Sequence, residues 1–200
     1  MGIKVQEKKK QKLEALLSSA FELFTVQGIN NTSISDIAKN AKMAKGTFYL
    51  YFKDKYDIRD KLIMHKAELV FEKARDALLQ SDVELFEDRI VFIVDNVLDQ
   101  LNENQSLLRF ISKNLSWAIF SNIRIQDMDN MKCMDIFEGL IRESGRQFRQ
   151  HDLMIYLIVE LVSASAYSVI LYQAPCTYET LKEELNQSVR TLIQQFEIHD

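Results

Sequence analysis

The stretch TSISDIAKNAKMAKGTFYLYFKDK, Thr32 to Lys55, has the pattern of two short helices separated by a tight break. Ser33 can cap the first helix, and Asp36 three residues later completes an S-x-x-D capping box. Lys42-Met43-Ala44 forms the break, and the second helix is predicted from Lys45 to Phe52. The first helix gains one apolar face from residues at helical spacing, which are Ile34, Ile37, Ala38 and Ala41.

The second helix is short, aromatic and flanked by lysines, so it suits a protein core poorly. In a helix-turn-helix it would lie in the major groove of DNA, while the first helix crosses the phosphate backbone. Base-edge or close backbone contacts are expected from Gly46, Thr47 and Tyr49. Phosphate contacts are expected from Ser33, Lys45, Tyr51, Lys53 and Lys55. The motif's own core is expected from Ile37, Ala38, Phe48 and Phe52.

The segment AKGTFYLYFKDK, residues 44–55, resembles the recognition helix of the tetracycline-repressor (TetR) family, and ISDIAKNA, residues 34–41, resembles the helix before it. The resemblance covers Lys10 to about Val70. It implies a TetR-type DNA-binding domain at residues 10–70, with the helix-turn-helix at about 33–52. It also implies a helical effector-binding and dimerisation domain at residues 71–200.

The chain departs from the family pattern at two positions. Lys42 stands in the turn where the family usually has Gly, so a bulkier residue must adopt a conformation that Gly adopts easily. Ala44 stands where Ser or Thr usually caps the recognition helix. This replacement removes a cap worth roughly 1 kcal/mol, together with a phosphate contact.

The composition favours an all-α fold. Among 200 residues, 47% are hydrophobic, and one Pro and five Gly leave few helix breakers. The charge is uneven: residues 1–65 hold 12 Lys and Arg against 7 Asp and Glu, whereas the remainder holds 13 against 22. This distribution predicts a basic N-terminal domain facing nucleic acid and an acidic C-terminal body.

The N-terminal residues 1–9 are polar and lysine-rich, and they lack the apolar stretch of a signal peptide. They are expected to be either a source of extra phosphate contacts or a disordered tail. Cys133 and Cys176 fit no metal spacing and are expected to be reduced thiols. A cytoplasmic protein is therefore predicted.

The remaining helices follow from apolar periodicity and from Gly, Pro and Ser breaks. The first, with a stripe from Leu13 to Phe24, should end at Gly28. The later ones are predicted at 55–80, 83–104, 106–121, 126–148, 153–174 and 178–198. The run 153–174 is long enough to span a membrane. Glu160 near its middle and the lack of flanking basic residues favour a fully buried helix instead.

The C-terminal body is predicted to bind a small apolar or aromatic effector and to form a homodimer. Aromatic and Met residues at helical spacing serve either as core or as a pocket; the pocket candidates are Phe92, Phe110, Trp117, Phe120, Met134, Phe137 and Tyr156. A heptad-like seam on the last helix is the candidate dimer interface, with intrachain packing as the alternative. The seam consists of Leu181, Leu185, Val189, Leu192 and Phe196.

No set of nucleophile and base is recognisable, the three His fit no metal motif, and no glycine-rich phosphate loop is present. We therefore expect no enzymatic activity, no cofactor and no metal. The favoured hypothesis is a ligand-responsive homodimeric transcription regulator, preferably a repressor, that binds a palindromic operator on double-stranded DNA. The alternative is a helical protein–protein interaction module whose helix-turn-helix serves only as a DNA anchor.

Overall fold

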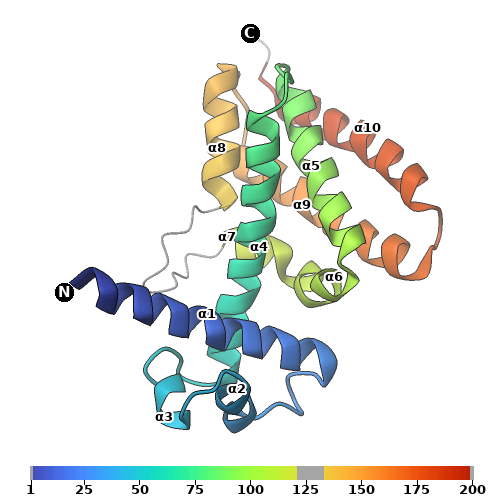
Figure 1. The fold of residues 1–200 in the computed structure, drawn as a ribbon. Coiled ribbons are helices and arrows are strands. Elements are labelled where there is room, and N and C mark those ends of the chain that lie inside the picture. The colour runs from blue at the N-terminus through green and yellow to red at the C-terminus, as the bar shows by residue number, and fades with distance from the viewer. Residues whose placement is uncertain (1, 121–132, 199–200) are drawn as a thin grey trace. The chain divides into compact units, whose positions relative to one another are not determined.

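The structure is a computed structural model, and it describes residues 2–120 and 133–198. These residues form helices and short connections, with one isolated antiparallel bridge between Phe148 and Glu197 (Figure 1). The all-α prediction is confirmed. The described residues divide into two compact units, one up to His65 and the other comprising residues 66–120 and 133–198, and each is described by itself.

The first unit contains α1 (Gly2–Val26), α2 (Ile34–Asn40), α3 (Lys45–Phe48) and the start of α4 (Lys55–Leu79). Helix α1 begins at Gly2, so the polar N-terminal segment is helical and the expectation of a disordered tail is wrong. Gly28 follows α1 with a φ of 79°, a left-handed conformation that Gly adopts without steric cost. The buried core of this unit includes Leu13, Leu16, Leu17, Ala20 and Phe24.

Helix α3 is shorter than predicted. Its α-helical residues end at Phe48, and the chain continues to Phe52 in hydrogen-bonded turns. The amide of Phe52 donates to the carbonyl of Phe48 at 3.0 Å, and that of Leu50 donates to Thr47 at 3.2 Å. The predicted core of the motif is confirmed, since four side chains are buried: Ile37, Ala38, Phe48 and Phe52.

The second unit contains the rest of α4 and the helices that follow it. These are α5 (Phe86–Glu103), α6 (Gln105–Ile111), the 3-10 helix η1 (Ser112–Asn114), α7 (Leu115–Phe120), α8 (Cys133–Ser144), α9 (His151–Tyr172) and α10 (Tyr178–Phe196). The single helix predicted at 106–121 is wrong, because η1 interrupts it. The 3-10 segment includes Ser112 and Asn114, and both residue types have lower helix propensity than Leu or Ala. The predicted beginning of α8 near Gln126 lies outside the described residues.

Helix α9 is buried on one side only, so the expectation of full burial is wrong. Met154, Ile158 and Val162 are buried, whereas Leu153, Leu157 and Leu161 lie on the exposed side. By length and composition alone this helix could cross a membrane, but half of its most apolar stretch is buried inside the protein. Core helices of soluble proteins meet the same criterion.

Helix α10 lies against α9 and α5 (Figure 1). Four residues of its predicted dimer seam are buried within the single chain: Leu181, Leu185, Val189 and Phe196. Leu192 is half-buried. These side chains therefore belong to the chain's own core, and their assignment to a dimer interface is wrong. The physical reason is that α10 has one apolar face, and α5 and α9 of the same chain already cover it.

Candidate nucleic-acid interface and ligand pocket

A reciprocal capping box begins α2. The Ser33 amide donates to Oδ2 of Asp36 at 2.9 Å, and the Asp36 amide donates to Oγ of Ser33 at 3.1 Å. The Ser33 hydroxyl also donates to Oδ2 of Asp36 at 2.6 Å, and these side-chain and backbone bonds hold the pKa of Asp36 below its usual value. Because its proton is directed at a carboxylate, Ser33 acts as a helix cap here and presents no free donor to a phosphate.

The turn after α2 contains the left-handed residue that the resemblance to the family pattern implied at position 42. Lys42 has a φ of 56°, in the left-handed region that a Gly would enter at no steric cost. The amide of Met43 donates back to the carbonyl of Ala38 at 2.8 Å and closes the turn. Ala44 then occupies the N-cap position of α3 without a side-chain hydrogen bond.

The exposed surface of α3 and the turn after it is partly aromatic and partly aliphatic. Tyr49 is 53% exposed and Leu50 is 79% exposed, while Phe48 between Thr47 and Tyr49 is fully buried. The rings of Phe48 and Tyr49 meet edge to face with centroids 5.6 Å apart, which anchors the exposed tyrosine to the core. Leu50 was missed at the sequence level, although an apolar residue between two tyrosines near the recognition helix was a usable signal.

Gly46 is exposed, and a Cβ placed on it would meet no atom within 4 Å. Its φ does not lie in the left-handed region. The fold itself therefore does not require glycine at this position. A glycine that the protein's own packing does not need suits a close approach by an external partner.

The lysines predicted to contact phosphates occupy different environments. Lys45 and Lys53 are exposed, and the backbone amide of Lys53 donates to Oδ2 of Asp57 at 2.8 Å. The ammonium of Lys55 instead donates to backbone carbonyls of the α1–α2 connection, among them that of Ile29 at 2.9 Å. Tyr51 is half-buried, and its carbonyl accepts a hydrogen bond from the Lys61 ammonium at 3.5 Å.

Asp54 caps α4, as predicted. Its Oδ1 accepts from the amides of Tyr56 at 2.8 Å and Asp57 at 2.9 Å, and these two bonds hold the pKa of Asp54 below its usual value. The cap fixes where the chain leaves the helix-turn-helix and begins the long helix.

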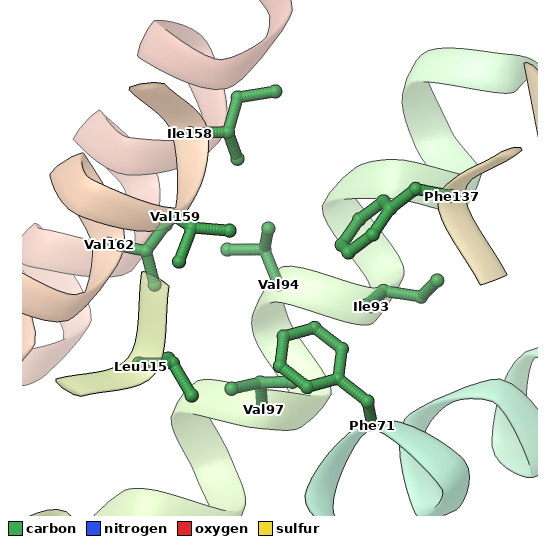
Figure 2. A pocket seen from close by; sticks show the side chains of 9 residues that line it. All are labelled: Phe71, Ile93, Val94, Val97, Leu115, Phe137, Ile158, Val159 and Val162. Atoms are coloured by element: carbon green, nitrogen blue, oxygen red, sulfur yellow. The ribbon is translucent and has the colours of Figure 1, made fainter. Parts of the chain in front are cut away.

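In the second unit, a narrow pocket lies among α4, α5, α7, α8 and α9 (Figure 2). Its empty volume is about 300 Å³, including space open to solvent. Figure 2 shows the rings of Phe71 and Phe137 both directed toward the middle of the pocket, and their ring centroids are 5.7 Å apart. The remaining lining residues are all aliphatic: Ile93, Val94, Val97, Leu115, Ile158, Val159 and Val162. Among the residues that the structure describes, no polar side chain lines this pocket.

Of the predicted ligand residues whose side chains the structure describes, Phe137 alone lines this pocket. Four others are half-buried elsewhere, namely Phe92, Phe110, Phe120 and Met134. Tyr156 is 41% exposed and contacts Phe120 with ring centroids 5.9 Å apart. The side chain of Trp117 lies outside the described residues. The sequence prediction selected aromatic residues, whereas short β-branched side chains line most of the pocket. The closely spaced valines of α5 were the available signal.

A family model described as bacterial regulatory proteins, tetR family, matches residues 16–62. The fatty acid metabolism regulator protein of Bacillus subtilis is 34% identical over 70 residues, covering 35% of this chain and 36% of that protein. An uncharacterised regulator of the same organism, YuxN, is 28% identical over 92 residues, covering 45% of this chain. The matched parts span 32% of YuxN and 23% of a second regulator, YvdT.

Solved structures share the fold over most of the chain. A TetR-family regulator from Shewanella sp. PV-4 superposes with a TM-score of 0.65 at 19% identity, covering 94% of this chain and 99% of that one. The regulator FadR of Bacillus subtilis, solved with stearoyl-CoA, superposes with a TM-score of 0.60 at 19% identity, covering 93% of this chain and 99% of that one.

A capped, two-helix motif on a buried aromatic core, joined to a helical second unit, defines a DNA-binding transcriptional regulator of the helix-turn-helix class. The match at residues 16–62 covers the whole of that motif. Residues 16–62 therefore carry the DNA-binding motif of the tetR family of bacterial regulatory proteins. The fold as a whole is that of solved TetR-family regulators.

Proposed function

We propose that this protein is a homodimeric, ligand-responsive repressor that binds a near-palindromic operator. The observation that carries the proposal is the exposed surface of Gly46, Tyr49 and Leu50, supported from beneath by the buried rings of Phe48 and Phe52. A recognition helix requires a rigid support and exposed groups that match the edges of DNA bases and thymine methyl groups. The half-buried Thr47 completes this surface.

Phosphate contacts would surround the reading surface. Lys45 precedes this surface in the sequence, Lys53 follows it, and both are exposed. The hydroxyl of the half-buried Tyr51 is a further candidate. Each lysine that neutralises a phosphate releases counterions and makes binding salt-dependent. Ser33 and Lys55 drop out of the predicted set, because their donors are engaged within the protein.

The pocket between α5 and α9 is the proposed effector site. Burying an unpaired polar group against its lining would cost roughly 2–7 kcal/mol, so an apolar or aromatic effector suits it. The stearoyl-CoA bound by FadR is compatible with a long apolar ligand in this fold, but it is a property of that protein. An effector would release DNA only if it binds the non-operator-binding state more tightly than the operator-binding state.

The homodimer is proposed to form through the exposed face of α9. Leu153, Leu157 and Leu161 follow one another at intervals of four residues and form one apolar stripe beside Tyr156. An apolar stripe of this length on a helix surface is typical of a protein interface. A second copy is the proposed partner, because two recognition helices related by a two-fold axis match a near-palindromic operator.

Two alternatives are tested by the same experiments. A protein–protein interaction module would bind a partner protein through the second unit and would show no effector-dependent release of DNA. An activator would use the same parts, since the sign of regulation depends on where the operator lies. A cytoplasmic location accompanies each of these functions.

The deciding experiment is selection of bound fragments from random double-stranded DNA by the purified protein. A consensus with two inverted half-sites is expected, and candidate apolar effectors can then be screened by release of that DNA. Salt-sensitive binding without sequence enrichment would contradict the operator-binding proposal and would favour the partner-protein alternative.

A further inference from the structure

The connection between α1 and α2 directs several backbone carbonyls toward one point. Two side chains of the turn hold it in place. The side-chain amide of Asn31 donates to the carbonyl of Gln27 at 3.0 Å, and the Thr32 hydroxyl donates to the carbonyl of Gly28 at 2.8 Å. Thr32 itself is buried. The Ile29 carbonyl accepts from the backbone amide of Thr32 at 3.3 Å, and the partly buried carbonyls of Ile29 and Thr32 can each accept a further donor.

The ammonium of Lys55 supplies those donors. It donates to the carbonyls of Ile29 at 2.9 Å, Asn30 at 3.2 Å and Thr32 at 3.3 Å. A lysine ammonium has three protons, so all of them are used by these three bonds. The carbonyls lie 23 to 26 residues before Lys55 in the sequence, which makes this a tertiary contact within the first unit.

The two ends of this contact lie at structurally decisive positions. Thr32 immediately precedes Ser33, the cap of α2, and Lys55 is the first residue of α4. Helix α3 and its turns lie between these points in the chain. The contact therefore closes a loop around the helix-turn-helix and fixes the start of α2 relative to the start of α4.

Lys53 offers a matched contrast two residues away. It is exposed, and its side chain has no hydrogen bond or ion pair with any residue in the described part of the chain. Its ammonium is available to a phosphate, whereas that of Lys55 could reach one only by leaving three carbonyls.

We propose that Lys55 is a positioning residue for DNA reading and makes no phosphate contact of its own. Its ammonium acts as a fixed internal cation that orients α2 and, through it, the recognition surface carrying Tyr49. The inference rests on the proposed DNA-binding function. It predicts that Lys53 and Lys55 have different roles although they share the same charge.

The test compares Lys55→Met with Lys53→Met, using variants whose circular dichroism confirms folding at the assay temperature. Specific and non-specific DNA affinities are measured across a salt series. Lys53→Met should weaken binding to all sequences alike and reduce the salt slope by about 1. Lys55→Met should leave the slope unchanged and reduce the ratio of specific to non-specific affinity, on the order of tenfold, as expected for lost charge-assisted hydrogen bonds.

A slope reduced by about 1 in Lys55→Met with an unchanged ratio would identify a phosphate contact and overturn the proposal. A Lys55→Met variant in which neither the salt slope nor the affinity ratio changes would overturn it as well.

Nitrogen-15 NMR of the wild-type ammonium groups, without DNA, provides a test that needs no variant. The Lys55 ammonium should exchange with water more slowly than that of Lys53, and equal rates would contradict the three hydrogen bonds. Failure of the wild type to bind DNA would refute the proposed function but leave this NMR result valid.

Discussion

The guanidinium of Arg146 donates from Nη1 to Oε1 of Glu87 at 2.7 Å, joining the α8–α9 connection to the first turn of α5. The same guanidinium also donates to both carboxylate oxygens of Glu197 near the C-terminus. It lies over the rings of Phe86 and Phe148, 5.3 and 5.5 Å from their centroids. One side chain therefore ties three separate segments of the second unit together.

Replacing Arg146 by Ala should destabilise the second unit. Two partly buried carboxylates would lose their hydrogen bonds to the guanidinium. A hydrogen bond to a charged group contributes about 1.5–3 kcal/mol, so a loss of about 2–3 kcal/mol is expected. The measurement is the urea denaturation midpoint. Arg142→Ala, at an exposed position on α8, is the control and should change the free energy of unfolding by less than about 0.5 kcal/mol. Equal effects of the two variants would refute the role of Arg146.

Gly46→Ala should separate stability from DNA binding. The new methyl group has open space, and an Ala in a helix is favoured over Gly by about 0.5–1 kcal/mol, so thermal stability should rise. Affinity for the operator should fall, because the methyl group would intrude where the backbone approaches DNA. Melting temperature and operator affinity are measured on the same preparation. Unchanged affinity would exclude close approach at Gly46.

Ala44→Ser should stabilise α3 by about 1 kcal/mol. Ala44 already has the extended backbone of an N-cap, with φ −69° and ψ 145°, and it lacks only the side-chain acceptor. The gain is measured by denaturant unfolding, with Ala44→Val as a control that adds bulk without an acceptor. If the two variants unfold alike, the missing cap does not limit the stability of this motif.

Tyr49→Ala should lower specific DNA affinity by about 1–3 kcal/mol while the protein stays folded. The side chain is more than half exposed, so its loss removes little core packing. Competition binding with consensus and scrambled DNA reports the specificity ratio. Tyr56→Ala, an exposed tyrosine at the start of α4, serves as the comparison. An unchanged ratio in Tyr49→Ala would argue against base reading by this residue.

Leu161→Glu should disrupt the dimer and leave the protomer folded. Leu161 is 36% exposed on the apolar stripe of α9, and a charge buried there against a second copy would be costly. Leu185→Ala, from the buried face of α10, should instead destabilise the protomer by about 2–5 kcal/mol. Sedimentation and thermal unfolding distinguish the two effects. A Leu161→Glu variant that remains dimeric would show that α9 is not the interface.

Local features were predictable because neighbouring residues produce them. The capping box of Ser33 and Asp36, the cap at Asp54 and the buried faces of the first helices follow from spacing and side-chain chemistry. The left-handed Lys42 was also foreseeable from the resemblance to a pattern with Gly at that position. The end of α3 at Phe48 was not predictable from the sequence. The turns after it bring the rings of Phe48 and Phe52 into contact, and this packing depends on the folded structure.

The sequence by itself determined the all-helical class and the tetR-type helix-turn-helix, since these depend on periodicity and on a contiguous motif. Only the tertiary structure decided which partner each apolar face meets and which lysine is internal. The seam of α10 was visible in the sequence, but its burial against α5 and α9 was not. Likewise, Lys53 and Lys55 look equivalent in the sequence. Their difference arises because folding brings the carbonyls of Ile29, Asn30 and Thr32 to one ammonium and not to the other.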